Sequence, residues 1–150
     1  MNSVNPKEYL LHIDSPAGRL MVPAVHKVVL REGELQCATV TLQLNGTTYV
    51  GHGDDTEYAL YDLAKQLPEG CMLRSCLSCR HGHFCPVGDV DNELFCVTDF
   101  EPKEKSDLYH VTEDASERNK RSRNLFHVCN KYKPQSGEYY TYSEYLYHVK

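Results

Sequence analysis

The chain has 150 residues, 41% of them hydrophobic and 25% charged, which fits one globular domain of ordinary composition. Its formal net charge of -5 disfavours general nucleic-acid binding, because nucleic-acid-binding proteins neutralise phosphates with a basic surface. No apolar run approaches the roughly 20 residues of a transmembrane helix, and no signal-peptide pattern opens the chain, so we expect a cytoplasmic protein that binds neither nucleic acid nor membrane.

Residues 8 to about 53 predict antiparallel β-strands. Segments 8–14 and 26–32 are rich in strand-forming residues and end in the turn sequences Ser-Pro-Ala-Gly and Glu-Gly. Segment 35–53 predicts a hairpin, since Asn45-Gly46 supplies the positive φ angles of a type I′ turn. Along the first arm of this hairpin apolar and polar residues alternate, which indicates one buried and one exposed face.

Residues 54–70 predict a helix that packs on one face of this sheet. Its apolar stripe consists of Ala59, Leu60, Leu63, Ala64 and Leu67. Asp54, followed by Glu57 three positions later, fits the N-terminal cap. Pro68 with Gly70 marks the end of the helix.

The second half of the chain has a different composition. Residues 71–100 contain most of the cysteines, and residues 101–123 are polar with little periodicity, which indicates a polar loop or a short exposed helix. The C-terminal segment contains six of the eleven tyrosines, with spacings that fit either a helix or strands. We expect a single domain over residues 1–150, with a β-rich part that includes the helix over 1–70 and a cysteine-site part over 71–150.

Seven cysteines are many for a cytosolic chain, in which disulfides do not persist and clustered thiols are more often metal ligands or catalytic groups. Cys76 and Cys79 form a C-x2-C pair. This spacing lets two thiolates on one turn bind a single tetrahedral ion at about 2.3 Å. Cys96 and Cys129, each in a short apolar-aromatic segment, are candidates for the second half of the site.

Four further residues are alternative ligands. Cys71 and Cys85 lie nearer in sequence to the C-x2-C pair, so spacing does not force the choice of four cysteines. His81 or His83 would complete a site of three cysteines and one histidine. Cys37 lies in the predicted hairpin and is expected to be a small buried apolar residue.

The pattern C-L-S-C-R-H-G-H-F-C-P-V-G … L-F-C … C-N-K-Y-K-P resembles a class of small, uncharacterised bacterial domains. In that class the C-x2-C pair is followed by an aromatic-x-Pro-x-Gly bend, a third cysteine and a late C-x-x-Phe/Tyr-x-Pro. The resemblance covers roughly residues 60–134. The cysteines that match its cysteine positions are Cys76, Cys79, Cys96 and Cys129. The resemblance implies a metal site and no particular reaction.

The same cysteine layout is similar to that of high-potential iron–sulfur proteins and of small iron–sulfur subunits in radical enzyme complexes, which hold a [4Fe–4S] cluster. The gap of 32 residues between Cys96 and Cys129, and the polar residues around it, depart from that layout. We therefore expect zinc as the cofactor, with an iron–sulfur cluster or no metal at all as the alternatives. The fold class expected is α+β: an N-terminal antiparallel β-sheet with one packed helix, followed by a metal-stapled, loop-rich C-terminal half.

Four thiolates fill every position around a zinc ion and leave none for water or substrate. The sequence therefore favours a non-enzymatic protein with a structural zinc site, a binding or interaction module with an unidentified protein partner, and the resemblance implies a bacterial one. One alternative is electron transfer through a [4Fe–4S] cluster, alone or as a small accessory subunit. Another is a zinc-dependent hydrolase with three protein ligands and a bound water, for which Asp89, Asp91 and Glu93 are the local carboxylates.

Overall fold

The computed structural model describes residues 2–4, 6–86 and 93–149. The chain divides into two compact units. Unit 1 comprises Met1–Leu73 and Tyr147–Lys150, and unit 2 comprises Arg74–Leu146. Strands and helices occur in both units, so the mixed α and β composition expected from the sequence is confirmed.

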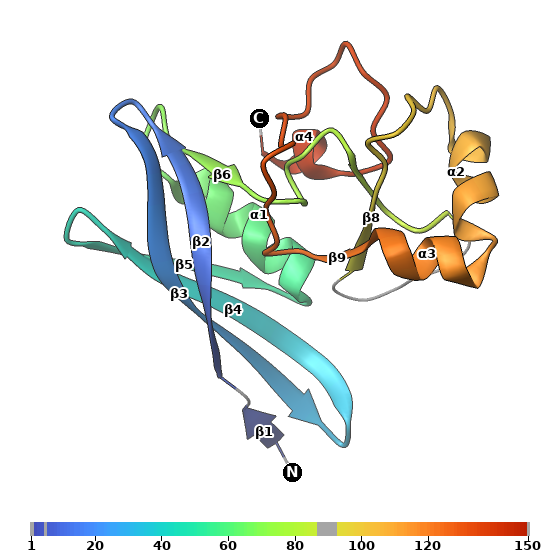
Figure 1. Cartoon of the computed structure of the whole chain (residues 1–150). Helices are drawn as coiled ribbons and strands as arrows, with labels where there is room; N and C mark the ends of the chain where they lie inside the picture. Colours follow the sequence, from blue (N-terminus) through green and yellow to red (C-terminus); the bar gives the residue numbers. More distant parts are fainter. Residues whose placement is uncertain (1, 5, 87–92, 150) are drawn as a thin grey trace. The chain divides into compact units, whose positions relative to one another are not determined.

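Unit 1 is built on a sheet whose strands lie in the order β5-β4-β3-β2-β6, with β1 also paired to β3 (Figure 1). The strands are β1 (Asn2–Val4), β2 (Lys7–Ser15), β3 (Gly18–Arg31), β4 (Glu34–Leu44), β5 (Thr47–Gly53) and β6 (Met72–Arg74). The pairs β2–β3, β3–β4 and β4–β5 are antiparallel, as predicted. β3 begins eight residues before the expected segment 26–32, because its first half pairs with β2 and its second half with β4.

Two tight turns set the register of this sheet. Asn45 and Gly46 have φ angles of 52° and 81°, which confirms the predicted type I′ turn between β4 and β5. Glu32 and Gly33, at 55° and 83°, form the turn between β3 and β4 in the same left-handed region.

The helix α1 (Thr56–Gln66) packs against β4 and β5, as predicted. Its N-cap is Asp55 and not the expected Asp54, because it is the Asp55 carboxylate that accepts from Tyr58 N at 2.9 Å. The helix lies so close to β5 that a Cβ on Gly51 would clash with the carbonyl oxygen of Ala59. The buried residues of this unit include Leu11, Ile13, Ala24, Val40, Leu42, Leu60 and Leu63.

Unit 2 consists of short elements joined by irregular segments. Its sheet has the order β7-β8-β9, with β7 (Gly82–His83), β8 (Glu93–Cys96) and β9 (Ser122–Asn124) paired antiparallel. The helices are α2 (Lys105–Thr112), α3 (Ala115–Arg121) and α4 (Tyr145–His148), the last of which ends in unit 1. No described helix is long and apolar enough to cross a membrane.

The polar segment 101–123, expected to be a loop or a short exposed helix, contains both α2 and α3. α2 begins with a capping box formed by Glu104 and Asp107. The N-cap of α3 is Asp114, whose carboxylate accepts from Ser116 N at 2.8 Å. These caps satisfy the first N–H groups of two helices that have little apolar periodicity of their own.

Candidate metal centre

Four cysteine side chains of unit 2 line one small cavity, which we call the cysteine cavity. They are Cys76, Cys79, Cys96 and Cys129. The cavity has a volume of about 10 Å³, room for roughly one water-sized sphere. His81 and Arg123 also line it. The fold thus brings the four predicted ligands to the same place from three separate segments.

The four thiols do not form a metal centre as they stand. Among residues 2–4, 6–86 and 93–149, no three Cys, His, Asp or Glu side chains are arranged so that they could hold a metal ion. All seven cysteines are free. The four cysteines therefore share a cavity but do not yet surround a common point. To bind an ion, their side chains would have to rotate toward one centre.

The thiols lie close enough to influence one another electrostatically. Burial first, and then the nearby thiols of Cys79, Cys96 and Cys129, together raise the pKa of Cys76 to about 12. Burial also raises the pKa of Cys96, which Arg123 partly opposes. The thiols of Cys76 and Cys96 are therefore protonated at neutral pH unless a cation replaces their protons.

Cys76 and Cys79 lie on a tight turn that is held by backbone hydrogen bonds. Ser78 N donates to the carbonyl oxygen of Ser75 at 3.1 Å, and Cys79 N donates to that of Cys76 at 3.3 Å. His81 N donates to Sγ of Cys79 at 3.5 Å, a bond that strengthens when the sulfur carries a charge. This turn is why both sulfurs of the C-x2-C pair reach one cavity.

Gly82 connects this turn to the third cysteine. Gly82 N donates to the carbonyl oxygen of Cys79 at 3.1 Å. A Cβ on Gly82 would clash with the carbonyl oxygen of Cys76, so the position requires glycine. In the β7–β8 pair Gly82 stands opposite Cys96, and one residue therefore fixes the approach of two cysteine-bearing segments.

Cys129 belongs to a segment that runs beside the C-x2-C turn. Cys76 N donates to the carbonyl oxygen of His127 at 2.7 Å, and Arg80 N donates to that of Lys133 at 2.7 Å. These bonds lie on either side of Cys129 in the sequence. Backbone hydrogen bonds therefore hold the segment of Cys129 against the turn.

Two buried polar side chains strengthen the same contact. Tyr132 and Ser78 share a hydrogen bond of 2.8 Å between their hydroxyls. Gln135 Nε2 donates to the carbonyl oxygens of Leu77 and Cys79 at 3.0 and 3.3 Å. Sequence reasoning missed Gln135, because no local pattern marks a glutamine whose partners lie 56 and 58 positions away.

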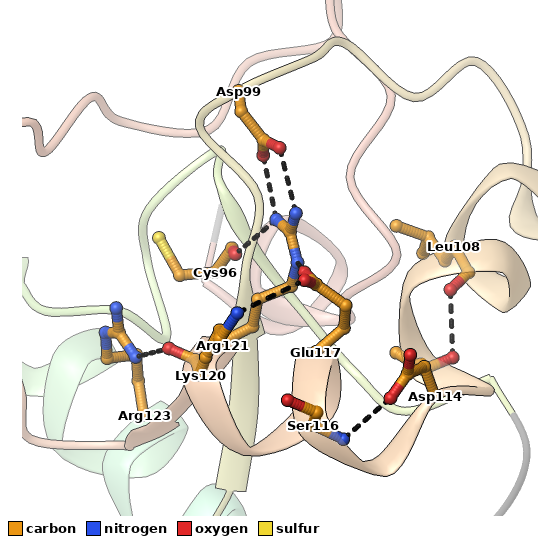
Figure 2. Close-up of polar contacts among 10 residues, drawn as sticks. Cys96, Asp99, Leu108, Asp114, Ser116, Glu117, Lys120, Arg121 and Arg123 are labelled. Carbon is orange, nitrogen blue, oxygen red and sulfur yellow. Dashed lines mark hydrogen bonds and ion pairs between the residues drawn. The ribbon is translucent and has the colours of Figure 1, made fainter.

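An ion pair fixes the backbone at Cys96 (Figure 2). The guanidinium of Arg121 donates to both carboxylate oxygens of Asp99 at 2.8 Å and to the carbonyl oxygen of Cys96 at 3.3 Å. The hydrogen bond between them raises the pKa of Arg121 and lowers that of Asp99. Only 13% of the Arg121 side chain is exposed. Sequence reasoning missed this residue, since its surroundings are polar and carry no motif.

Of the alternative ligands, only His81 lines the cysteine cavity within the part of the chain that the structure describes. Cys71 belongs to unit 1, and Cys85 and His83 belong to unit 2 without lining the cavity. His83 is buried, which lowers its pKa to about 4. Its Nδ1 accepts a hydrogen bond from Tyr142 N at 3.0 Å.

The carboxylates considered for a hydrolase are not part of this geometry. Asp89 and Asp91 lie outside the described residues, and so does the side chain of Glu93. No Asp or Glu of the described residues lines the cysteine cavity. Cys37, expected to be buried, is half-buried in β4 opposite Val29.

No known protein family, curated protein or solved structure matches the chain. The resemblance to bacterial four-cysteine domains and the layout shared with iron–sulfur proteins therefore remain predictions from cysteine spacing. The function has to be argued from the contacts of the cysteine cavity itself.

Proposed function

We propose that unit 2 is an interaction module stabilised by one structural zinc ion. The proposed ligands are Cys76, Cys79, Cys96 and Cys129. The observation that carries this proposal is that, of seven described cysteines, only these four line the cysteine cavity. Its volume of about 10 Å³ suits a single ion better than a cluster of four irons and four sulfides.

The donor set suits zinc. Four thiolates at about 2.3 Å are a common closed, tetrahedral zinc site, and such sites stabilise the fold without leaving a position for substrate. Binding requires each thiol to lose its proton and each side chain to rotate toward the centre. The backbone hydrogen bonds of Cys76 and Cys79 already hold the turn in place, so side-chain rotation is the main rearrangement needed.

A fixed cation beside the cavity supports an anionic centre. Zinc with four thiolates carries two net negative charges, which are costly to bury without compensation. Arg123 lines the cavity. Its Nη1 donates to the carbonyl oxygen of Lys120 at 2.8 Å (Figure 2) and to that of Ser122 at 2.8 Å. The guanidinium is therefore held where its charge offsets part of this cost.

The alternatives differ in what they require of the same residues. A [4Fe–4S] electron-transfer site would require the lining side chains to open a larger space than the present cavity of about 10 Å³. A zinc hydrolase requires an open metal position and a nearby acid or base, and no described carboxylate lines the cavity. A site in which His81 replaces one cysteine has a supporting observation, since His81 lines the cavity as well.

The deciding measurement is the metal content and visible spectrum of protein purified without oxygen. One zinc per chain and no colour are expected. A brown protein with about four irons per chain would replace zinc by an iron–sulfur cluster. If the purified protein contains neither zinc nor iron in a stoichiometric amount, the proposed site is refuted.

Variants then test the ligand set. Cys129→Ser should lose the bound zinc, whereas Cys85→Ser should keep it, because Cys85 does not line the cavity. His81→Gln should also keep the zinc if all four ligands are cysteines. Loss of zinc in His81→Gln together with retention in one cysteine variant would establish the three-cysteine, one-histidine site instead.

A further inference from the structure

Two cations stand opposite each other beside the C-x2-C turn. Cys79 and Pro134 form an antiparallel bridge, and Arg80 N donates to the carbonyl oxygen of Lys133 at 2.7 Å. Arg80 and Lys133 are therefore neighbours across this bridge. Like charges placed opposite each other destabilise a strand pair, so these two cations concentrate positive charge here at some cost to the bridge.

Lys131 adds a third positive charge to the same place. Lys131 and Lys133 are exposed and Arg80 is partly so, and all three lie near enough to His81 to act on it electrostatically. None of the three has an ion-pair partner among the described residues. The ion pairs of unit 2 instead involve Lys103, Lys120 and Arg121.

The Arg80 side chain is ordered by contacts with two neighbouring residues. Its guanidinium lies 3.8 Å from the ring centroid of Tyr139, and its Nε donates to the carbonyl oxygen of Pro134 at 3.4 Å. These contacts leave its terminal amino groups to form a two-pronged hydrogen bond with a carboxylate. A side chain that is already ordered loses less entropy when it binds.

We propose that Arg80, Lys131 and Lys133 form a cationic surface that binds a short acidic segment of a partner protein. This inference deepens the proposed function and rests on it, since it gives the interaction module a partner of defined charge. A peptide suits the surface better than a nucleic acid, because the whole chain carries a net charge of -5. A long polyanion would be repelled by the rest of the protein, whereas a short one interacts mainly with charges within about 8–10 Å.

The exposed face of Tyr139 supports a protein partner. Tyr139 is 39% exposed and lies under the Arg80 guanidinium, so an apolar contact adjoins the charges. A tyrosine and an arginine side by side are typical of the residues that contribute most to protein–protein binding. The expected partner segment therefore combines several carboxylates with at least one apolar side chain.

The test is fluorescence anisotropy with a labelled peptide of sequence Glu-Asp-Leu-Glu-Asp-Glu, at about 50 mM salt. The zinc-loaded full chain should bind it at least about tenfold more tightly than a Gln-Asn-Leu-Gln-Asn-Gln peptide, and added salt should weaken the binding. The double variant Lys131→Glu, Lys133→Glu should bind at least about tenfold more weakly. The control Lys103→Glu, Lys120→Glu changes the net charge equally and should bind within about twofold of the unaltered chain.

Equal weakening by both double variants would overturn the proposal, because net charge alone would then explain the binding. Tighter binding of a single-stranded oligonucleotide than of the peptide would also overturn it, in favour of a nucleic acid. Zinc content is measured in parallel. If a chain that holds no zinc binds the peptide, the cationic surface is supported and the metal site is refuted. If a zinc-loaded chain binds no peptide, the metal site is supported and the cationic surface is refuted. The variant Lys131→Gln, Lys133→Gln repeats the test without introducing negative charge.

Discussion

Gly82 passes so close to Cys76 that a Cβ on the glycine would overlap the cysteine's carbonyl oxygen. Gly82→Ala should therefore distort the C-x2-C turn and lower the free energy of unfolding by about 1–3 kcal/mol. It should also weaken zinc binding, because the turn positions two of the proposed ligands. Urea unfolding and zinc competition with a chelator measure the two effects.

The matched control is Gly137→Ala, at a glycine in the same unit with nothing within 4 Å of an added Cβ. Its free energy of unfolding should stay within about 0.5 kcal/mol of the unaltered chain. If the two variants behave alike, the close approach at Gly82 has no energetic importance.

Arg123→Gln should weaken zinc binding by about tenfold, as is usual when a charged neighbour of a metal ligand is removed. The reason is that Arg123 lines the cysteine cavity and would compensate the charge of the four thiolates in the proposed zinc site. Chelator competition measures the affinity. Arg118→Gln removes the same charge from α3 without touching the cavity and should leave the affinity unchanged; a similar loss there would point to net charge as the cause.

The edge strand β5 is protected by two side chains of α1. His52 N donates to the Asp62 carboxylate at 2.8 Å, and Gln66 Nε2 donates to the carbonyl oxygen of Val50 at 2.8 Å. Because β5 ends the sheet, these bonds occupy backbone groups that would otherwise pair with another chain.

The double variant Asp62→Ala, Gln66→Ala should consequently self-associate. Sedimentation velocity over a concentration series should show dimers or larger species that the unaltered chain lacks. Lys65→Ala, an exposed substitution on the same helix, serves as the control. A double variant that stays as monomeric as Lys65→Ala would mean that the two side chains do not guard the edge.

Stability should fall as the pH drops below about 6.5, the ordinary pKa of histidine, in part through His26. Burial and then the nearby Lys7 lower the pKa of His26 in the folded chain, and its Nε2 hydrogen-bonds Thr56 Oγ1 at 2.8 Å. In the window between the two pKa values the unfolded chain binds a proton that the folded chain does not, so acid favours unfolding. Above this window the effect vanishes.

This dependence is measured as the difference in unfolding free energy between pH 7.5 and pH 5.5. His26→Gln should show a smaller difference than the unaltered chain, with a slope change of at most about 1.4 kcal/mol per pH unit. His52→Gln, at an exposed histidine of β5, should not reduce it. An unchanged difference in His26→Gln would assign the pH dependence to other groups, the cysteine cavity included.

The parts of the fold that sequence predicts well are those set by neighbouring residues. Asn45-Gly46 determines its hairpin through its own φ angles, and the apolar stripe of α1 identifies the helix. The predicted N-cap of α1 was wrong by one residue. Asp54 and Asp55 have the same side chain, and only the backbone geometry determines which of them caps the helix. The extent of β3 depended on its partners on both sides, which local patterns do not contain.

The candidate site likewise has a part that the sequence predicts and a part that only the folded chain shows. Spacing predicts that Cys76 and Cys79 act together, because a single turn joins them. The approach of Cys129 depends on contacts such as Gln135 with Leu77, 58 positions apart, and the anchoring of Cys96 on the pair Arg121 and Asp99. Neither contact leaves a periodic signal in the sequence. That only four of seven thiols share a cavity is a property of the folded chain.

The order of the cysteines has a consequence for protein synthesis. Of the four proposed ligands, Cys76, Cys79 and Cys96 leave the ribosome first. Cys129 follows 33 residues after Cys96, which is roughly two to seven seconds at about 5–20 residues per second. During that interval a nascent chain that has captured zinc would hold it with three thiolates and one vacant position. Low-molecular-weight thiols of the cell would be able to occupy that position until Cys129 arrives. Binding of Cys129 would therefore determine when the zinc ion stops exchanging ligands with the solution.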